Sequence, residues 1–311
     1  MKILFTLKPP EGSGGGGCFF VKNLVNYFKK KKIEIVYTLQ KNIDLIFIID
    51  PRKNSTNNFH IDQIINYKKK NPNTKIIHRV NECDIKRKKS INIEPLILKA
   101  MKNADHVVFV SDWLKNYYHT KYKLNLKCSS IINGCDSKFF FPKFKKIDFK
   151  KKIKIITHHF SNNYLKGFEI YNQIDKLLNN NCNFTFTFVG NYNKDYRPKN
   201  IKLLKATQGI ELANIIREHD IYLTATQFEP GAMHYVEGLS CGLPILFRKN
   251  GGGAFEVCNK CGLEFNNIND FLVKLKLLID KYDTFRNNID YNFLGSDRCN
   301  NEYIKIIEQF C

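Results

Sequence analysis

The sequence predicts an α/β protein with two parallel-sheet, Rossmann-like domains, and three observations support this. Short apolar runs of strand length alternate with amphipathic stretches of helix length, which is typical of parallel sheets covered by helices. The alternation occurs twice, on either side of residues 142–152, a proline-marked, lysine-rich segment without a hydrophobic period. With 311 residues, 43% of them hydrophobic, the chain is long enough for two domains.

The first domain is expected over residues 1–141. Its strand-like and helix-like stretches alternate along the chain, with strands expected at 2–6, 33–37, 44–49, 75–80 and 106–110, and helices at 61–70 and 94–103. Residues 142–152 are expected to be the linker to the second domain.

A glycine-rich loop, residues 12–17 (GSGGGG), follows the first expected strand and opens an amphipathic helix at 19–30. Such a loop lets the backbone approach a phosphate or a sugar closely, so Gly15 and Gly16 are candidate ligand contacts. The loop lacks the Gly-Lys-Ser/Thr ending of a P-loop. It also lacks the acidic residue that a dinucleotide-binding fingerprint places at the end of the second strand.

The second domain is expected over residues 153–290, with strands at 153–157, 184–189, 201–204, 221–224 and 244–247. Residues 291–311 are expected to form a C-terminal helix. Two sheets joined by a linker leave a cleft between them, and a ligand is expected there.

The stretch 220–256 carries the chemistry from which a function can be inferred. A buried strand runs into Glu229-Pro230-Gly231 and then into a helix that contains Glu237. A diphosphate held by the N–H groups of Gly231 and Ala232 would have one carboxylate near each of its two substituents, which fits a nucleoside diphosphate sugar. Taken alone, the spacing favours the simpler interpretation, two exposed surface carboxylates.

The residues around these glutamates narrow the choice. Glu-Pro-Gly, seven residues between the glutamates, Cys-Gly-Leu-Pro at 241–244, and the glycines 251–253 followed by Glu256 occur in order within this stretch. This order resembles the C-terminal donor-site signature of glycosyltransferase family 4, the retaining enzymes of the GT-B fold. The chain departs from the family pattern at Gly231-Ala232, where Phe-Gly is common.

The resemblance extends into other parts of the chain and assigns roles. The first domain would be the acceptor side and the second the nucleotide-sugar donor side, with the C-terminal helix crossing back to the first domain. Glu229 would position the sugar, Glu237 the ribose, and Lys166, followed by Gly167, would neutralise the leaving diphosphate. The residues expected to contact the donor are Gly15, Gly16, His158, Lys166, Gly167, Gly190, Glu229, Gly231, Ala232, Met233 and Glu237, and the catalytic residues among them are Glu229 and Lys166.

The arginine that the family places near this lysine is absent, and only His158 and His159 stand nearby. Either a histidine substitutes, which would make donor binding depend on pH around 6.5, or the charge comes from elsewhere. His78, at the end of a first-domain strand, either faces the transferred sugar or has a core or surface role.

The implied function is a retaining, hexosyltransferase-type glycosyltransferase of glycan biosynthesis that uses a nucleotide sugar as co-substrate, with no cofactor and an unidentified acceptor. No Asp-x-Asp pair occurs in the sequence, so a metal-independent reaction is expected and no metal site is predicted. Two alternatives stay open: a sugar epimerase or phosphorylase on the same fold, and a non-enzymatic basic binding protein. Cys258 and Cys261 are expected to flank a turn rather than bind zinc.

The formal charge of +21, from 50 lysines and arginines, allows three explanations. These are compositional bias from an AT-rich genome, attraction to an anionic membrane surface, and, least favoured, nucleic-acid binding. No transmembrane helix and no secretory signal are expected, so the sequence predicts a cytoplasmic protein, with peripheral membrane contact as an open alternative.

Overall fold

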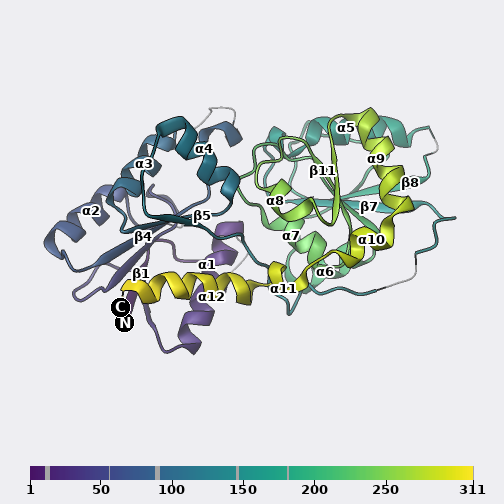
Figure 1. The fold of residues 1–311 in the computed structure, drawn as a ribbon. Helices are drawn as coiled ribbons and strands as arrows, with labels where there is room; N and C mark the ends of the chain where they lie inside the picture. The colour runs from purple at the N-terminus through teal and green to yellow at the C-terminus, as the bar shows by residue number, and fades with distance from the viewer. Residues whose placement is uncertain (11–14, 56, 88–91, 145–146, 181, 311) are drawn as a thin grey trace. The chain divides into compact units, whose positions relative to one another are not determined.

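The computed structural model describes residues 1–10, 15–55, 57–87, 92–144, 147–180 and 182–310. The chain forms two compact units (Figure 1): unit 1 comprises Met1–Asn133 and Ser296–Cys311, and unit 2 comprises Gly134–Gly295. The expected boundary at 141 and the expected linker 142–152 both fall within unit 2. Each unit contains one six-stranded parallel sheet, which confirms the predicted fold class.

The sheet of unit 1 has the strand order β2-β1-β3-β4-β5-β6, and all of its strands run parallel. The strands are β1 Lys2–Phe5, β2 Glu34–Val36, β3 Leu45–Ile48, β4 Lys75–Val80, β5 His106–Phe109 and β6 Cys128–Ser130. The helices are α1 Gly16–Lys30, α2 Ile61–Lys70, α3 Glu94–Asn103, α4 Asp112–Tyr122 and α12 Ser296–Ile307, with short 3-10 turns at Asp84–Arg87 and Glu308–Phe310. The expected strands and helices of this unit are all present within a few residues of their predicted ends, and β6 was not predicted.

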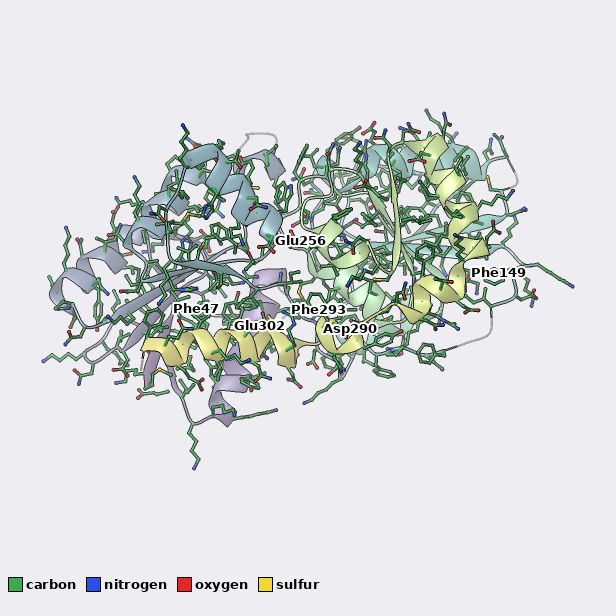
Figure 2. The ribbon with its side chains drawn as sticks, viewed as in Figure 1. Phe47, Phe149, Glu256, Asp290, Phe293 and Glu302 are labelled. Atoms are coloured by element: carbon green, nitrogen blue, oxygen red, sulfur yellow. The ribbon has the colours of Figure 1, made fainter. Side chains whose placement is uncertain are left out.

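The C-terminal helix α12 belongs to the core of unit 1. Tyr303 of α12 is fully buried, with its ring centroid 5.0 Å from that of Phe20 on α1 and 5.6 Å from that of Phe47 on β3. Figure 2 shows Phe47 between the sheet of unit 1 and α12. The segment expected as one C-terminal helix, 291–311, is divided at Gly295, and its first part, α11 Tyr291–Leu294, lies in unit 2.

The sheet of unit 2 has the order β12-β11-β10-β7-β8-β9 and is also parallel throughout. The strands are β7 Ile153–His159, β8 Phe184–Gly190, β9 Lys202–Leu204, β10 Ile221–Thr224, β11 Ile245–Arg248 and β12 Gly262–Phe265. A 3-10 turn at Tyr164–Lys166 precedes the helices α5 Phe168–Leu178, α6 Gly209–Arg217, α7 Met233–Ser240, α8 Ala254–Cys258, α9 Ile268–Asp280, α10 Tyr282–Asn287 and α11.

Both sheets reverse their strand order next to a central strand. In unit 1 the reversal lies between β1 and β3, and in unit 2 it lies between β7 and β10. The loops that leave the carboxyl ends of such neighbouring strands diverge, and ligands of open α/β sheets bind in the crevice that forms there. The topology therefore gives each unit one favoured position for a site.

Two further predictions concern the chain as a whole. The Cys258–Cys261 segment is a turn at the end of α8, where the N–H of Cys261 donates to the carbonyl of Cys258 at 3.1 Å, and both thiols are buried. Within the described residues, every helix is too short or too polar to cross a membrane.

Candidate functional site

The crevice of unit 2 brings together the predicted catalytic residues. Lys166 lies in the loop after β7, Glu229 lies in the loop after β10, and the Lys166 Nζ forms an ion pair with the Glu229 Oε2. The two side chains are only 12% and 5% exposed. Separating two charges that are largely removed from water would leave each of them buried without a partner, so this pair holds the two loops together.

A glycine makes this approach of the two loops feasible. Gly167 has a φ of +102°, and a Cβ added there would lie 2.6 Å from the Cβ of Ala225, the residue that follows β10. The N–H of Gln227 also donates to the carbonyl of Leu165 at 2.9 Å, which ties the two loops together. The Lys-Gly pair of the sequence thus combines a charged side chain with a backbone that only glycine fits.

The glycine cluster 251–253 packs against the backbone of Glu229. The carbonyl of Glu229 accepts a hydrogen bond from the N–H of Gly253 at 2.9 Å. Gly252 has a φ of +73°, and a Cβ at this position would lie 2.3 Å from the same carbonyl oxygen. In this structure the cluster therefore packs against the backbone of Glu229, a role that its sequence did not indicate.

The second glutamate, Glu237 on α7, is held by a histidine. The Nε2 of His158 lies 2.7 Å from the Oε2 of Glu237, and the Nδ1 of His158 lies 2.9 Å from the hydroxyl of Tyr222 on β10. The backbone N–H of His158 donates to that same hydroxyl at 3.2 Å. An ionised carboxylate can only accept, so in the neutral ring Nε2 donates to Glu237 and Nδ1 accepts from the Tyr222 hydroxyl. Both ring nitrogens of His158 are thereby occupied.

The packing of α7 favours this arrangement. A Cβ at Gly238, next to Glu237, would lie 2.4 Å from the ring of Tyr222. The glycine thus leaves space for the tyrosine ring against the helix, and the ring brings its hydroxyl to His158.

The neighbouring histidine, His159, lies deeper in the unit. Its Nε2 is 2.8 Å from the hydroxyl of Tyr171, and its ring centroid is 4.6 Å from that of His234 on α7. Burial, followed by the electrostatic effects of His234 and of the Lys166 ammonium, lowers the pKa of His159 well below 6.5. His159 is therefore neutral at physiological pH, and it adds no positive charge to the crevice.

Three residues at the start of α7 were expected to hold a diphosphate. Ala232 occupies the N-cap position and Met233 begins the helix, with Gly231 before them. The N–H of Ala232 donates to the hydroxyl of Tyr235 at 3.0 Å. This N–H therefore already has a hydrogen bond, which a ligand would have to replace.

Gly190 was also expected near the donor, and it ends β8 beside His159. It has a φ of +142°, and a Cβ there would lie 1.9 Å from the His159 carbonyl oxygen. Gly190 thus lets β8 run alongside the end of β7, close to the histidines of the crevice.

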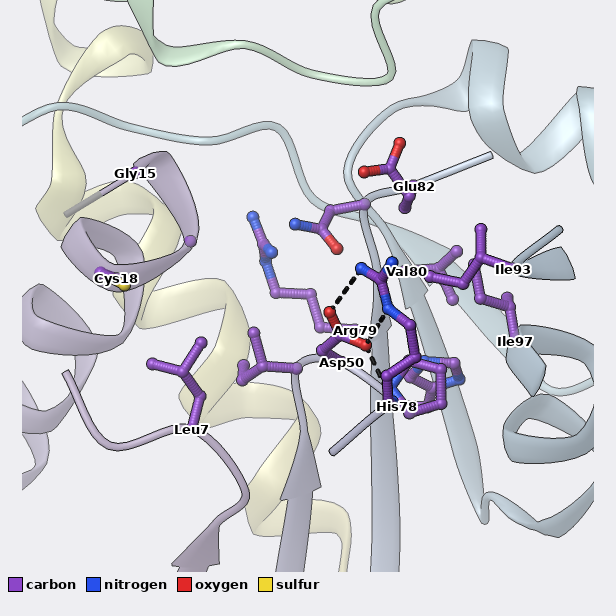
Figure 3. A pocket seen from close by; sticks show the side chains of 15 residues that line it. Leu7, Gly15, Cys18, Asp50, His78, Arg79, Val80, Glu82, Ile93 and Ile97 are labelled. Atoms are coloured by element: carbon purple, nitrogen blue, oxygen red, sulfur yellow. Dashed lines mark hydrogen bonds and ion pairs between the residues drawn. The ribbon is translucent and has the colours of Figure 1, made fainter. Parts of the chain in front are cut away.

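The remaining predicted residues, Gly15, Gly16 and His78, belong to unit 1. Gly15 is the N-cap of α1, and a Cβ there would meet nothing within 4 Å. His78 and Gly15 line a pocket of about 350 Å³ at the strand-order reversal of unit 1 (Figure 3). Burial lowers the pKa of His78 to about 3, so this histidine is neutral.

Three residues of the unit 2 crevice were not predicted from the sequence: Tyr171, Tyr222 and His234. In the sequence, His234 lies between Glu229 and Glu237. In the structure, its Nε2 is 2.8 Å from the Thr224 Oγ1. Tyr222 and Thr224 alternate along β10, and a polar alternation on a fully buried strand is the one signal that could have drawn attention to them.

The two-sheet architecture defines a class of protein, the GT-B type of glycosyltransferase fold. No family model and no curated protein matches the sequence. Among solved structures, the chain is similar to the sucrose-phosphate synthase of Thermosynechococcus elongatus, with a TM-score of 0.72, 11% identity, and coverage of 99% of this chain and 98% of that one.

Two other solved structures are similar over almost the whole chain. Anabaena HepE in complex with UDP and glucose aligns with a TM-score of 0.72 at 14% identity, over 99% of this chain and 100% of HepE. A glycosyltransferase from Rickettsia africae aligns with a TM-score of 0.65 at 16% identity, over 99% and 98% of the two chains. At these identities the similarity establishes the fold, and the chemistry has to be argued from the residues.

Proposed function

We propose that the protein is a family 4-type glycosyltransferase that transfers a sugar, with retention of configuration and without a metal, from a nucleoside diphosphate sugar to an acceptor. The observation that carries this proposal is the Lys166–Glu229 ion pair at the strand-order reversal of unit 2, with Glu237 held nearby on α7. The UDP and glucose bound to HepE, which shares the fold, agree with such a donor.

Lys166 and Glu229 exchange partners when the donor binds. The leaving diphosphate draws the Lys166 ammonium away from Glu229, and the Glu229 carboxylate then accepts hydrogen bonds from the sugar hydroxyls. The negative charge that develops on the diphosphate during transfer is stabilised by Lys166 and by the N–H groups of Gly231, Ala232 and Met233 at the start of α7. Gly167 and Gly190 shape the backbone around this position.

Glu237 binds the ribose of the nucleotide in this proposal, and His158 positions it. The hydrogen bond from His158 fixes one oxygen of the Glu237 carboxylate at 2.7 Å, so the second oxygen is oriented for a ribose hydroxyl. Because the ring proton of His158 is directed to Glu237, we assign His158 to positioning rather than to replacing the arginine of the family. Gly15 and Gly16 stay a prediction for donor binding; Gly15 also lines the pocket of unit 1, and competition with UDP, described below, decides between donor and acceptor there.

Contact with an anionic membrane surface is a second part of the proposal. Phe141, Phe144 and Phe149 in unit 2 are 44%, 65% and 47% exposed, in a stretch that also carries exposed lysines. Aromatic rings between lysines suit the interface of an anionic bilayer, where each basic residue contributes about 1 kcal/mol.

The test of the proposal is calorimetric titration of the purified protein with UDP-, GDP- and ADP-sugars, with and without EDTA. We expect one nucleotide class to bind, EDTA to leave binding unchanged, and Glu229→Ala to abolish transfer. Product analysis separates the alternatives, because an epimerase or phosphorylase changes the donor without glycosylating an acceptor. A protein that binds none of these nucleotide sugars would refute the proposal.

A further inference from the structure

The pocket of unit 1 contains charged residues that the proposed donor site does not use. It opens at the carboxyl ends of β1, β3 and β4, and Figure 3 shows Gly15 and Cys18 of α1 on one side and Ile93 and Ile97 on the other. The polar side chains that line it are Asp50, Arg52, His78, Arg79, Asn81 and Glu82. Its volume of about 350 Å³ is at the lower end of the range for small-molecule sites.

Most of the charge in this pocket is already balanced. The Arg52 Nε and Nη2 donate to the two carboxylate oxygens of Asp50 at 3.0 and 2.8 Å, so this pair is internally neutral. Glu82 lies 3.8 Å from the ammonium of Lys86, and His78 is neutral. None of these groups therefore calls for a charged ligand.

Arg79 is the exception. Its side chain is only 2% exposed, and its Nη2 donates to the neutral Oδ1 of Asn133 at 2.9 Å. The guanidinium lies 4.0 Å from the ring centroid of Phe20 and also interacts with the buried hydroxyl of Tyr303 on α12. Nε and Nη1 make no hydrogen bond within 3.5 Å, and both of these further partners are uncharged. Among the described residues, no carboxylate forms an ion pair with Arg79. A buried cation without an anionic partner is costly, and it is more stable when a negative charge lies beside it.

Helix α1 adds a second positive contribution. Its first residues line the same pocket, it has 15 residues, and its first turn contains no acidic side chain. The N-terminus of such a helix carries a partial positive charge and N–H groups without helical partners. Arg79 and α1 therefore both favour an anion at this end of unit 1.

We propose that this pocket binds an oxyanion, a phosphate or carboxylate group on a small molecule, through Arg79 and the N-terminus of α1. If the proposed glycosyltransferase function holds, this group belongs to the acceptor, and the acceptor is a small anionic sugar or polyol rather than a neutral one. The balanced groups Asp50, Arg52 and Glu82 then offer hydrogen bonds to its hydroxyls.

The test uses the full-length protein and calorimetric titration with glucose 6-phosphate, glucuronate, inorganic phosphate and glucose. We expect the anionic probes to bind and glucose not to bind. Arg79→Gln is expected to weaken anion binding at least about tenfold, which corresponds to the loss of one charge-assisted hydrogen bond. Arg217→Gln is the matched control, because Arg217 is also buried and stacked on a phenylalanine, Phe141, at 4.4 Å, but lies in unit 2.

A second measurement locates the anion without a variant. Phosphate is expected to shift the amide resonances of Gly15, Gly17 and Asn81 in the wild-type protein. Shifts confined to unit 2, equal affinity in Arg79→Gln and wild type, or no binding of any anionic probe would each overturn the proposal.

A competition experiment between UDP and glucose 6-phosphate shows whether the oxyanion in the pocket belongs to the donor or to the acceptor. UDP that displaces glucose 6-phosphate would mean that the pocket takes the donor diphosphate, and this would overturn the assignment to the acceptor. A protein that binds glucose 6-phosphate at Arg79 but binds no nucleotide sugar would refute the glycosyltransferase proposal and leave the oxyanion pocket in place.

Discussion

The two units share a sheet topology but differ in whether the buried cation beside the strand-order reversal has a carboxylate partner. Each places polar side chains where a six-stranded parallel sheet reverses its strand order. In unit 2 the buried ammonium of Lys166 is paired with Glu229, whereas in unit 1 the buried guanidinium of Arg79 contacts uncharged groups, among them the Asn133 amide, the Phe20 ring and the Tyr303 hydroxyl. A paired site can bind a ligand by exchanging partners, and an unpaired site gains most from a ligand that supplies the missing charge.

The largest effect is expected from breaking the pair in unit 2. Lys166→Met leaves the Glu229 carboxylate buried without its cation, so we expect a loss of about 3 kcal/mol of stability and at least about a hundredfold slower transfer. Urea unfolding and initial rates measure the two effects. Lys176→Met, at an exposed lysine of α5, is the control and should change neither.

The double variant Lys166→Met/Glu229→Gln sharpens this comparison. Removing both charges should restore most of the stability lost in Lys166→Met, because no buried charge is left unpaired, while transfer stays slow. A double variant as unstable as Lys166→Met alone would show that the charges are not coupled in the way described here.

The next effect concerns the backbone behind Glu229. Gly252→Ala forces a Cβ toward the Glu229 carbonyl at a positive φ, and we expect a loss of about 1–3 kcal/mol of stability together with weaker donor binding. Gly15→Ala, at a position with open space and no positive φ, should leave the Tm unchanged. Equal Tm values for Gly252→Ala and wild type would contradict the close packing.

The two units should share one sensitivity to acid. His78 in unit 1 and His159 in unit 2 both have pKa values lowered by burial, so the unfolded chain takes up a proton near pH 6.5 that the folded chain does not. The free energy of unfolding is therefore expected to fall as the pH drops below 6.5. Each of the two histidines contributes at most about 1.4 kcal/mol per pH unit to this fall. Urea unfolding at pH 7 and pH 5 tests this, and His78→Asn should reduce the difference; an unchanged difference in that variant would argue against it.

The smallest effect is expected at Tyr222. Tyr222→Phe removes the hydroxyl that orients His158 toward Glu237, and UDP binding should weaken about five- to tenfold, the equivalent of one hydrogen bond. Binding of 2′-deoxy- or 3′-deoxy-UDP should change less, because the proposed ribose contact is already missing. Tyr118→Phe, which removes a 3.0 Å hydrogen bond to the carbonyl of Glu82 in unit 1, is the control. Equal losses for the ribo- and deoxynucleotides would rule out positioning of Glu237.

The hydrophobic pattern predicted most of the fold, and the missed strands show where such patterns fail. β6, Cys128–Ser130, is a half-buried edge strand of polar residues, so it lacks an apolar run. β12 begins at Gly262, where a Cβ would lie 1.9 Å from the carbonyl oxygen of Ile245. Only glycine fits there because the neighbouring strand lies so close. In a sequence, however, a glycine usually indicates the end of a strand rather than its start.

The site was predictable where its residues lie close together in the sequence. Glu229 and Glu237 lie in one continuous loop and helix, and the residues around them in the sequence drew attention to them. The contact of His158 with Tyr222 and Glu237 depends on β7 lying beside β10, a pairing between residues more than sixty positions apart. No local pattern encodes that pairing, so the sequence could not indicate that His158 contacts Glu237.

The return of α12 to unit 1 has a consequence for biosynthesis. Phe20 and Phe47 belong to the part of the chain that leaves the ribosome first, but Tyr303, which covers them, is synthesised after the whole of unit 2. Unit 2 is therefore the first unit that can complete its core during translation, although it starts at Gly134. Until α12 arrives, the nascent unit 1 exposes an aromatic surface, and such surfaces are the ones that chaperones bind and that promote aggregation.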